Sequence, residues 1–413
     1  MLSVDEALAR ILNEFRTLPA EEVDVAGALG RVLAQDVRAE LNLPPFANSS
    51  MDGYAVKAAD VAAASADQPI ALQVVADIPA GSGTPVAIES GQAARIMTGA
   101  PVPTGANAVV PVENTDDTPR GLQSADQLAA APPAQIRIFQ TVRPGDYVRP
   151  VGEDIQAGQV VLRAGRVLRP ADLGAIVGLG LSRVQVVRRP VVAVLSTGDE
   201  LLEMGVPLAP GKIRDTNGYT IPALVEQLDA TPIRLGIARD NVEDVKAHLT
   251  RAVDLGADLI LSSAGVSVGA FDVVKTVIES LGAIGFWKVN MRPGKPLAFG
   301  NVQGVPLMGL PGNPVSAMVS FDVFARPAIL KMAGRNWQTD LAEAELAEPM
   351  TSDGRRTYLR VTLERVNGHL VARSTGTQSS GALSSLVLAD GLLIIPEGVT
   401  EILAGTRLPV QLY

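Results

Sequence analysis

The stretch "DLILSSAGVSVGAFDVVK", residues 258–275, joins an apolar run to a glycine-rich loop and then to the beginning of an amphipathic helix. Further short apolar runs lie at residues 191–196, 232–238, 284–289 and 305–310. Helical patterns fill three of the gaps between these runs, and such alternation is typical of βαβ units. A parallel sheet built in this way is covered on both faces, so residues 181–335 are predicted to form an α/β domain.

The regions on both sides of this domain have a different pattern. Residues 43–144 contain short apolar runs broken by glycine and proline, which predicts a small β domain. This β domain is expected to be inserted between two pieces of another domain, residues 1–42 and 145–180. Residues 336–413 contain several strand-like runs and predict a small β-barrel or sandwich. The predicted fold class is therefore α/β plus β: a multidomain chain with a central parallel-sheet domain, an inserted small β domain and a C-terminal barrel-like domain.

The composition excludes several classes of function. The 413 residues carry a formal net charge of −9, whereas nucleic-acid binding needs a basic surface. The chain has no cysteine, so disulfides, thiolate metal sites and thiol nucleophiles are excluded. Ser3 and Glu6 have capping-box spacing before an amphipathic helix, unlike an export signal. The apolar glycine-rich run at 171–181 is far below the ~20 residues of a membrane-spanning helix. We expect a cytoplasmic protein that binds neither nucleic acid nor membrane.

Each unusual loop of the predicted α/β domain follows a strand. These loops are residues 196–200, 239–241, 262–272, 290–296 and 310–316. Ligands of open parallel sheets bind beyond the carboxyl ends of the strands, so we expect the loops to converge on one edge. The candidate ligand contacts in the first, third and last of them are Ser196, Thr197, Gly198, Ser263, Pro311, Gly312 and Asn313. Asn313 can also cap the helix that follows, with Pro314 in its first turn.

The glycine-rich loop has the features of an anion cradle. Gly265 and Gly269 permit backbone conformations closed to other residues, and with Val266 and Ser267 they can present N–H groups to an anion. The chain contains neither the phosphate-loop motif of nucleotide triphosphatases nor a dinucleotide fingerprint. An ordinary glycine-rich turn is the alternative interpretation.

Charged residues of both signs lie in the predicted edge loops. Lys288, Arg292 and Lys295 flank a Pro-Gly turn and can bind an anion, although a solvated basic turn would look the same. Four carboxylates belong to the same edge: Asp199, Glu200, Asp240 and Asp272. Carboxylates beside an anion cradle suggest a bridging Mg²⁺, which prefers oxygen ligands, and helix capping is the alternative for Asp272.

Two further candidates precede the α/β domain. Asp52 lies in "SSMDGYA", a loop without an evident structural need for that sequence, and Thr98 lies in "MTGAPVP". A simple turn is the alternative for both. The two histidines, His248 in a predicted helix and His369 in a predicted hairpin turn, are expected to be non-catalytic.

The motifs together resemble the molybdopterin molybdenumtransferases, a family that includes the E domain of gephyrin. In chain order they are "PPFANSSMDGYAV", "RIMTGAPVPTGANAVV", "GEDI", "STGDEL", "IRDTNGY", "SSAGVSVGAFD", "WKVNMRPGKPLAFG", "LPGNPVSA" and "LSSLVLADGLLIIPEG". The resemblance implies a Mg²⁺-dependent enzyme that inserts molybdate into adenylated molybdopterin and releases AMP. It also implies a homodimer of four-domain subunits with residues 1–42 and 145–180 as the linking and dimerisation domain. The active cleft is then expected between the α/β domain of one subunit and the small β domain of the other.

The resemblance also implies roles for individual residues. Asp52, Thr98, Glu200, Asp240 and Asp272 match the polar cleft residues, and Asp240 and Asp272 are expected to handle metal or phosphate. The implied anion pocket comprises Lys288, Arg292, Lys295, Arg356 and Ser380, and Asp215 of "IRDTNGY" is an implied substrate contact. Four positions depart from the common family pattern: Ala264, Arg292, Thr377 and Ser379.

Several alternative functions stay open. The adenylyltransferase that makes adenylated molybdopterin resembles only residues 181–335, and pyrophosphatases or deamidases with a "TGDEL"-like loop are expected to lack "MDGYAV" and "MTGAPVP". A catalytically silent molybdopterin-binding or scaffold protein and a tungstate-inserting homologue remain alternatives. Expected partners are small-molecule substrates, a second copy of the chain, other cofactor-synthesis enzymes and apo-molybdoenzymes.

Overall fold

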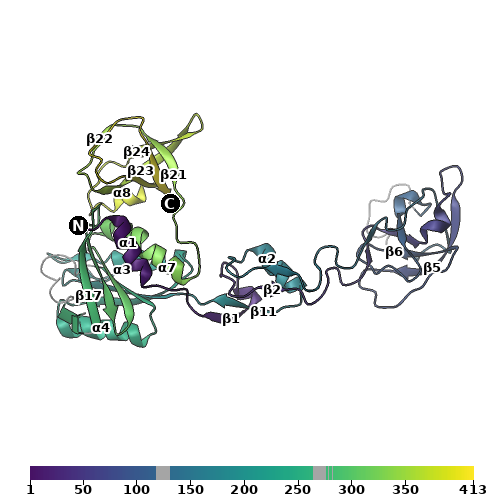
Figure 1. Ribbon diagram of the computed structural model, residues 1–413, viewed down its shortest axis with the longest axis horizontal. Helices are drawn as coiled ribbons and strands as arrows, with labels where there is room; N and C mark the ends of the chain where they lie inside the picture. Colours follow the sequence, from purple (N-terminus) through teal and green to yellow (C-terminus); the bar gives the residue numbers. More distant parts are fainter. Residues whose placement is uncertain (118–130, 264–275, 278, 281) are drawn as a thin grey trace. The chain divides into compact units, whose positions relative to one another are not determined.

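The structure is a computed structural model that describes residues 1–117, 131–263, 276–277, 279–280 and 282–413 (Figure 1). The chain divides into two compact units. The first comprises Met1–Gln35, Gly165–Arg169 and Arg183–Tyr413, and the second comprises Asp36–Ala164 and Pro170–Ser182. The predicted contacts of the glycine-rich loop, one predicted carboxylate and one departure from the family pattern lie outside the described residues. They are Gly265, Val266, Ser267 and Gly269, then Asp272, and Ala264.

A six-stranded sheet forms the centre of the first unit. Its order is β15 (Thr231–Ala238), β12 (Val191–Thr197), β16 (Leu259–Ser263), β20 (Val305–Leu310), β19 (Pro296–Val302) and β17 (Gly282–Lys288). The first four strands are parallel, as predicted, whereas β19 is antiparallel to both β20 and β17. The sequence analysis did not identify β19. Because β17 again points the same way as the parallel strands, the basic loop that follows it lies at their carboxyl edge.

Helices cover both faces of this sheet because its strands alternate their side chains. On β12, Val192 and Val194 pack with α1 (Val4–Asn13), α3 (Asn217–Gln227) and α7 (Arg326–Met332). The intervening residues Ala193 and Leu195 pack with α4 (Val242–Asp254) on the opposite face (Figure 1). Because successive side chains point to opposite faces, one strand contributes to both apolar faces of the sheet.

The C-terminal part of the first unit is a closed barrel. Its five strands, in ring order, are β23 (Arg356–Val366), β24 (His369–Ser374), β21 (Ala342–Leu346), β27 (Arg407–Leu412) and β25 (Gly391–Ile395), with β25 pairing again with β23. The short strand β18 (Met291–Arg292) pairs with the start of β23. This pairing attaches the basic loop of the α/β sheet to the barrel.

The second unit contains a five-stranded sheet in the order β7 (Ala108–Pro111), β4 (Gly53–Val56), β6 (Gln92–Ile96), β5 (Ile70–Ile78) and β8 (Gln135–Ile138). The predicted small β domain is therefore rich in strands, as expected. The same unit holds helix α2 (Pro170–Gly178). The division into four domains at the boundaries given above stays a prediction.

The described helices include none that is both long and apolar enough to cross a membrane.

Candidate active site

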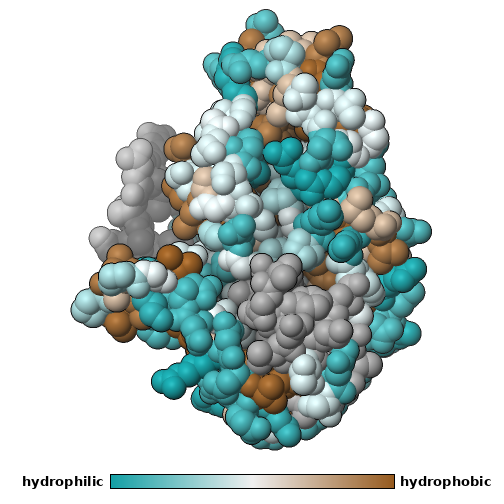
Figure 2. Space-filling view, turned by 90° about the vertical axis from the view of Figure 1, so that its left-hand side faces the viewer, coloured by the Kyte–Doolittle hydropathy of each residue, from teal (hydrophilic) through white to brown (hydrophobic). Residues whose placement is uncertain are grey.

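The edge loops of the first unit converge on one cleft of about 920 Å³. This volume is within the range of small-molecule sites. Its lining residues include Thr197, Gly198, Glu200, Asp215, Asp240, Ser263, Arg292, Lys295, Pro311, Gly312, Asn313 and Ser380. Described residues of all five loops therefore line the cleft, as the positions of the loops predict. On the face shown in Figure 2, hydrophilic residues gather where the barrel, at the top, meets the sheet region below.

The floor of the cleft, at the carboxyl ends of β12 and β16, is polar but uncharged apart from Asp215. Ser196 donates a hydrogen bond from its hydroxyl to Asp215 Oδ1 at 2.9 Å, and the Gly218 amide donates to the same oxygen at 2.8 Å. Gly218 is required here because a Cβ would lie 2.1 Å from Asp215 Oδ2. Asn217, which the sequence analysis did not single out, donates from Nδ2 to the Gly312 carbonyl at 2.8 Å.

Several buried polar atoms of this floor have no hydrogen-bond partner within the described part of the chain. They are Thr197 Oγ1, Asp215 Oδ2 and Asn217 Oδ1. A buried polar group without a partner is costly, so these atoms are suited to bind a ligand that donates hydrogen bonds. Asp215 Oδ2 has one distant cation, Arg234 Nη2 at 3.8 Å.

Carboxylates occupy the side of the cleft after β12 and β15. The Asp240 amide donates to Asp199 Oδ1 at 3.3 Å, which brings these two predicted residues together. Burial raises the pKa of Asp240, and the nearby charges of Asp199 and Glu200 raise it further, although a hydrogen bond from the Asp199 backbone to the Asp240 carboxylate opposes this. Asp240 Oδ1 is buried without a partner among the described residues. Gly198, at φ +147°, is also constrained, because a Cβ there would lie 2.6 Å from Glu200 Oε2.

The described carboxylates do not by themselves form a complete metal site. No group of three or more His, Cys, Asp or Glu residues in the described parts of the chain could hold a metal ion. Mg²⁺, however, is commonly held by one or two carboxylates, waters and substrate phosphates. The unpartnered oxygen and raised pKa of Asp240 fit such a partial site.

The opposite side of the cleft is cationic, and its composition differs in part from the prediction. Arg292 and Lys295 line the cleft as expected, and Arg355 lines it as well. Arg356, the predicted residue, instead forms a two-fold ion pair with Asp5 of α1, at 2.7 Å for both contacts. Lys288, also predicted, is exposed at the end of β17 and is not among the described residues that line the cleft. The family resemblance implied Arg356, and the sequence analysis did not single out the adjacent Arg355.

The barrel contributes neutral donors and acceptors beside these cations. Gln378, Ser379 and Ser380 line the cleft. Asn313 donates from Nδ2 to Ser380 Oγ at 2.9 Å. Asn313 does precede helix α6 (Pro314–Ser320), and Pro314 lies in the first turn, but the Asn313 side chain makes no capping hydrogen bond. It connects the α/β sheet to the barrel instead of capping the helix.

Asp52 and Thr98 lie together in the second unit. Thr98 donates two hydrogen bonds to Asp52 Oδ1, from its amide at 2.7 Å and from its hydroxyl at 2.8 Å. The two motifs, far apart in sequence, meet because β4 and β6 are neighbours in the sheet.

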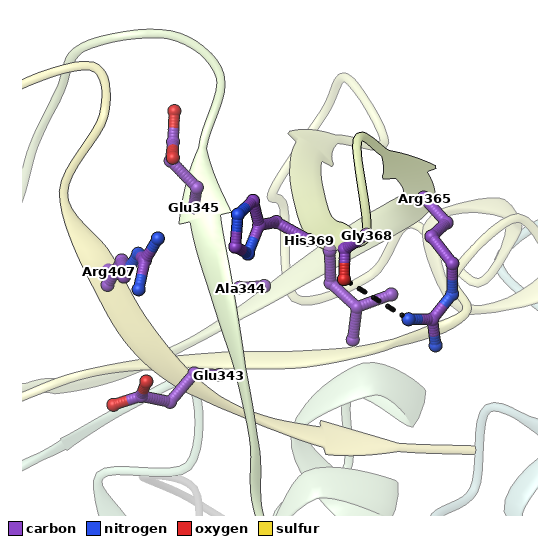
Figure 3. A pocket seen from close by; sticks show the side chains of 8 residues that line it. Glu343, Ala344, Glu345, Arg365, Gly368, His369 and Arg407 are labelled. Atoms are coloured by element: carbon purple, nitrogen blue, oxygen red, sulfur yellow. Dashed lines mark hydrogen bonds between the residues drawn. The ribbon is translucent and has the colours of Figure 1, made fainter.

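Neither histidine lies in the described lining of the cleft. His248 is on α4, where Nδ1 is 2.7 Å from the Asp244 carbonyl oxygen. His369 lines a separate pocket of about 210 Å³ on the barrel. Its ring lies between Arg365 on one side and Glu345 and Arg407 on the other (Figure 3).

Comparison with known protein families identifies three regions in this chain. Residues 2–180 match the "MoeA N-terminal region (domain I and II)", residues 193–331 match the "Probable molybdopterin binding domain", and residues 343–413 match the "MoeA C-terminal region (domain IV)".

Full-length relatives and solved structures agree with these matches. The chain is 42% identical to molybdopterin molybdenumtransferase 2 of Mycobacterium tuberculosis, over 99% of both chains. It is 35% identical to the molybdopterin molybdenumtransferase of Haemophilus influenzae, over 100% of this chain and 98% of that protein. Two structures of the molybdopterin biosynthesis MoeA protein from Pyrococcus horikoshii superpose with TM-scores of 0.82 and 0.77, at 32% and 31% identity, over all of this chain and at least 99% of theirs.

Proposed function

The chain belongs to the molybdopterin molybdenumtransferase family, and we propose that it inserts molybdate into adenylated molybdopterin with Mg²⁺-dependent release of AMP. The observation that carries this proposal is the division of one cleft into three chemically different parts. Polar atoms that have no partner among the described residues form its floor, carboxylates form one side, and arginine, lysine and hydroxyl groups form the other.

Each part suits one portion of the reactants. The buried acceptors Asp215 Oδ2 and Asn217 Oδ1 suit the N–H groups of the pterin ring. Arg292, Lys295 and Arg355, together with Ser380, suit a tetrahedral oxyanion such as molybdate. Substrate phosphates that bind between the two charged sides need a cation between themselves and the carboxylates. Asp240 and Glu200 line the cleft and are suited to hold such a cation.

The chemistry consists of two coupled changes. The two dithiolene sulfurs form bonds to molybdenum, and the displaced oxygen atoms leave as water after protonation. Addition of one water across the phosphoanhydride separates AMP from the terminal phosphate of the cofactor. Mg²⁺, when bound, offsets the negative charge that develops on the phosphate oxygens. The chain's own groups orient the anhydride, hold the oxyanion close to the sulfurs and limit the access of water.

Other parts of the proposal rest on the family relationship alone. They are the homodimeric state, the contribution of Asp52 and Thr98 to the cleft of a second copy, the metal role of Asp272, the cytoplasmic location and the transfer of product to apo-molybdoenzymes.

The direct test is to incubate the purified protein with adenylated molybdopterin, molybdate and Mg²⁺. AMP release and activation of an apo-molybdoenzyme are measured together. AMP that appears only with molybdate, accompanied by enzyme activation, supports the proposal. Substrate binding without turnover would contradict it and would favour a binding or scaffold function. Turnover with tungstate only would indicate the tungstate-inserting alternative.

A further inference from the structure

Asp353 lies between two of the cationic residues of the cleft. This aspartate belongs to the turn that precedes β23. Both of its carboxylate oxygens are 3.1 Å from Arg355 Nε, and Arg355 Nη2 contacts Oδ2 more closely. The same Oδ2 is 3.6 Å from Arg292 Nη1. One carboxylate is therefore shared by an arginine of the barrel and an arginine of the α/β sheet.

These contacts occupy much of the hydrogen-bonding capacity of Arg355. Its Nε and Nη2 donate to Asp353, and its Nη1 donates to the Met291 carbonyl at 3.2 Å. An oxyanion that accepts two hydrogen bonds from Nε and Nη2 of Arg355 has to displace the Asp353 carboxylate. Arg292, whose side chain is 49% exposed, has Asp353 as its one ion-pair partner within the described structure. The arginine hydrogen bond also lowers the pKa of Asp353, so the carboxylate is charged at neutral pH.

The charge of the group matches its expected ligand. Arg292, Lys295 and Arg355 contribute three positive charges and Asp353 one negative charge, so the group carries two positive charges. A tetrahedral dianion carries two negative charges. Without Asp353 the same group would be more attractive to anions of every kind.

We propose that Asp353 is an internal counter-ion of the anion pocket, which holds Arg292 and Arg355 in the cleft and competes with the oxyanion for Arg355. This inference rests on the proposed function, in which the cationic side of the cleft binds molybdate. Asp353 is a positioning residue that keeps Arg292 and Arg355 in place and limits the affinity of the pocket for oxyanions.

Asp353→Asn separates this role from a purely structural one. Asn is nearly isosteric and keeps an oxygen that can accept from the Arg355 amide, which contacts Asp353 Oδ1 at 3.2 Å. It removes the negative charge and replaces the second acceptor oxygen by an NH2 group, which cannot accept from Arg355. Glu343→Gln is the matched control, because it makes the same change in net charge on an exposed barrel residue outside the described cleft lining.

The test measures binding of molybdate to the full-length protein by calorimetry, with sulfate as a second tetrahedral dianion. At about 20 mM salt, Asp353→Asn is expected to tighten molybdate binding about 3- to 10-fold, and at about 500 mM salt this gain is expected to shrink to less than about 2-fold. Glu343→Gln is expected to leave affinity unchanged. In turnover assays Asp353→Asn is expected to lower the KM for molybdate without raising kcat.

The outcomes distinguish this inference from the proposed function. Tighter oxyanion binding without AMP release in any variant would support the counter-ion role while contradicting the transferase. Unchanged or weaker binding in a folded Asp353→Asn protein would overturn the counter-ion role even if AMP release is normal. Absence of oxyanion binding in the wild type and in both variants would also overturn it.

Discussion

Asp52 Oδ1 accepts two hydrogen bonds from one residue, Thr98, at 2.7 and 2.8 Å. Asp60 in the same unit has a similar arrangement, with Ser90 Oγ at 2.7 Å and the Gly91 amide at 2.9 Å. If Asp52 acts in catalysis, Asp52→Asn is expected to lower kcat about 100-fold or more with little change in melting temperature. Asp60→Asn is the control and should leave kcat unchanged. Equal activity in the two variants would show that the Asp52–Thr98 pair is structural.

Mixed dimers test whether Asp52 works in the cleft of a second copy. Neither Asp52→Asn nor Asp240→Asn is expected to be active alone. After verified subunit exchange, each mixed dimer is expected to regain one intact site of its two. Activity should therefore rise above that of either parent. A mixture that stays inactive would place Asp52 and Asp240 in the same chain's site.

Arg355 and Arg356 are adjacent but face different partners, so their substitutions should have different effects. Arg355→Gln is expected to raise the KM for molybdate by about 10- to 100-fold, because a charged donor to the oxyanion is lost. Arg356→Gln removes the ion pair with the largely exposed Asp5 and is expected to cost about 0.5–1 kcal/mol of stability without a large change in KM. Steady-state kinetics and chemical denaturation of both variants measure these effects. A larger KM effect in Arg356→Gln would reverse the assignment.

Asp240 is the described carboxylate best placed to bind a divalent cation. Its pKa is raised by burial and by neighbouring carboxylates, so protonation competes with the cation at a higher pH than for an exposed aspartate. Mn²⁺ binding, followed by electron paramagnetic resonance in place of Mg²⁺, is expected to weaken as the pH falls. Asp240→Asn should weaken it about 10-fold or more. Asp254→Asn, an exposed change at the end of α4, is the control. Equal Mn²⁺ binding in both variants would exclude Asp240 as a ligand.

Asp322 links stability to pH. It lies in the π-helical turn between α6 and α7, and burial raises its pKa to about 7, although Arg326 opposes the shift. The folded protein therefore holds this proton to a higher pH than the unfolded chain does. The resulting stability is fully present below about pH 4 and is lost as the pH rises through 7.

Asp322→Asn is expected to be more stable than the wild type by about 1–3 kcal/mol at pH 8, with a smaller difference at pH 5. Denaturation at several pH values checks this, with the exposed Asp340→Asn as control. A difference that does not change with pH would contradict it.

The sequence by itself determined the alternation of strands and helices, the strand-rich regions on both sides and the convergence of the edge loops. These features depend on local periodicity. Successive side chains of a strand point to opposite faces, so a strand that lies between two layers of helices is apolar at successive positions. It also determined the family, through motifs distributed along nearly the whole chain.

Tertiary structure decided the features that depend on which distant segments pair. Pairing of β18 with β23 directs Arg355 into the cleft and leaves Arg356 with Asp5, because successive residues at the start of a strand point to opposite sides. The same pairing places Asp353 beside Arg292, about 60 residues earlier in the chain. Asn313 likewise bonds to Ser380 instead of capping its own helix. Local patterns carry no information on such contacts, because the partners are brought together only when the barrel closes against the α/β sheet.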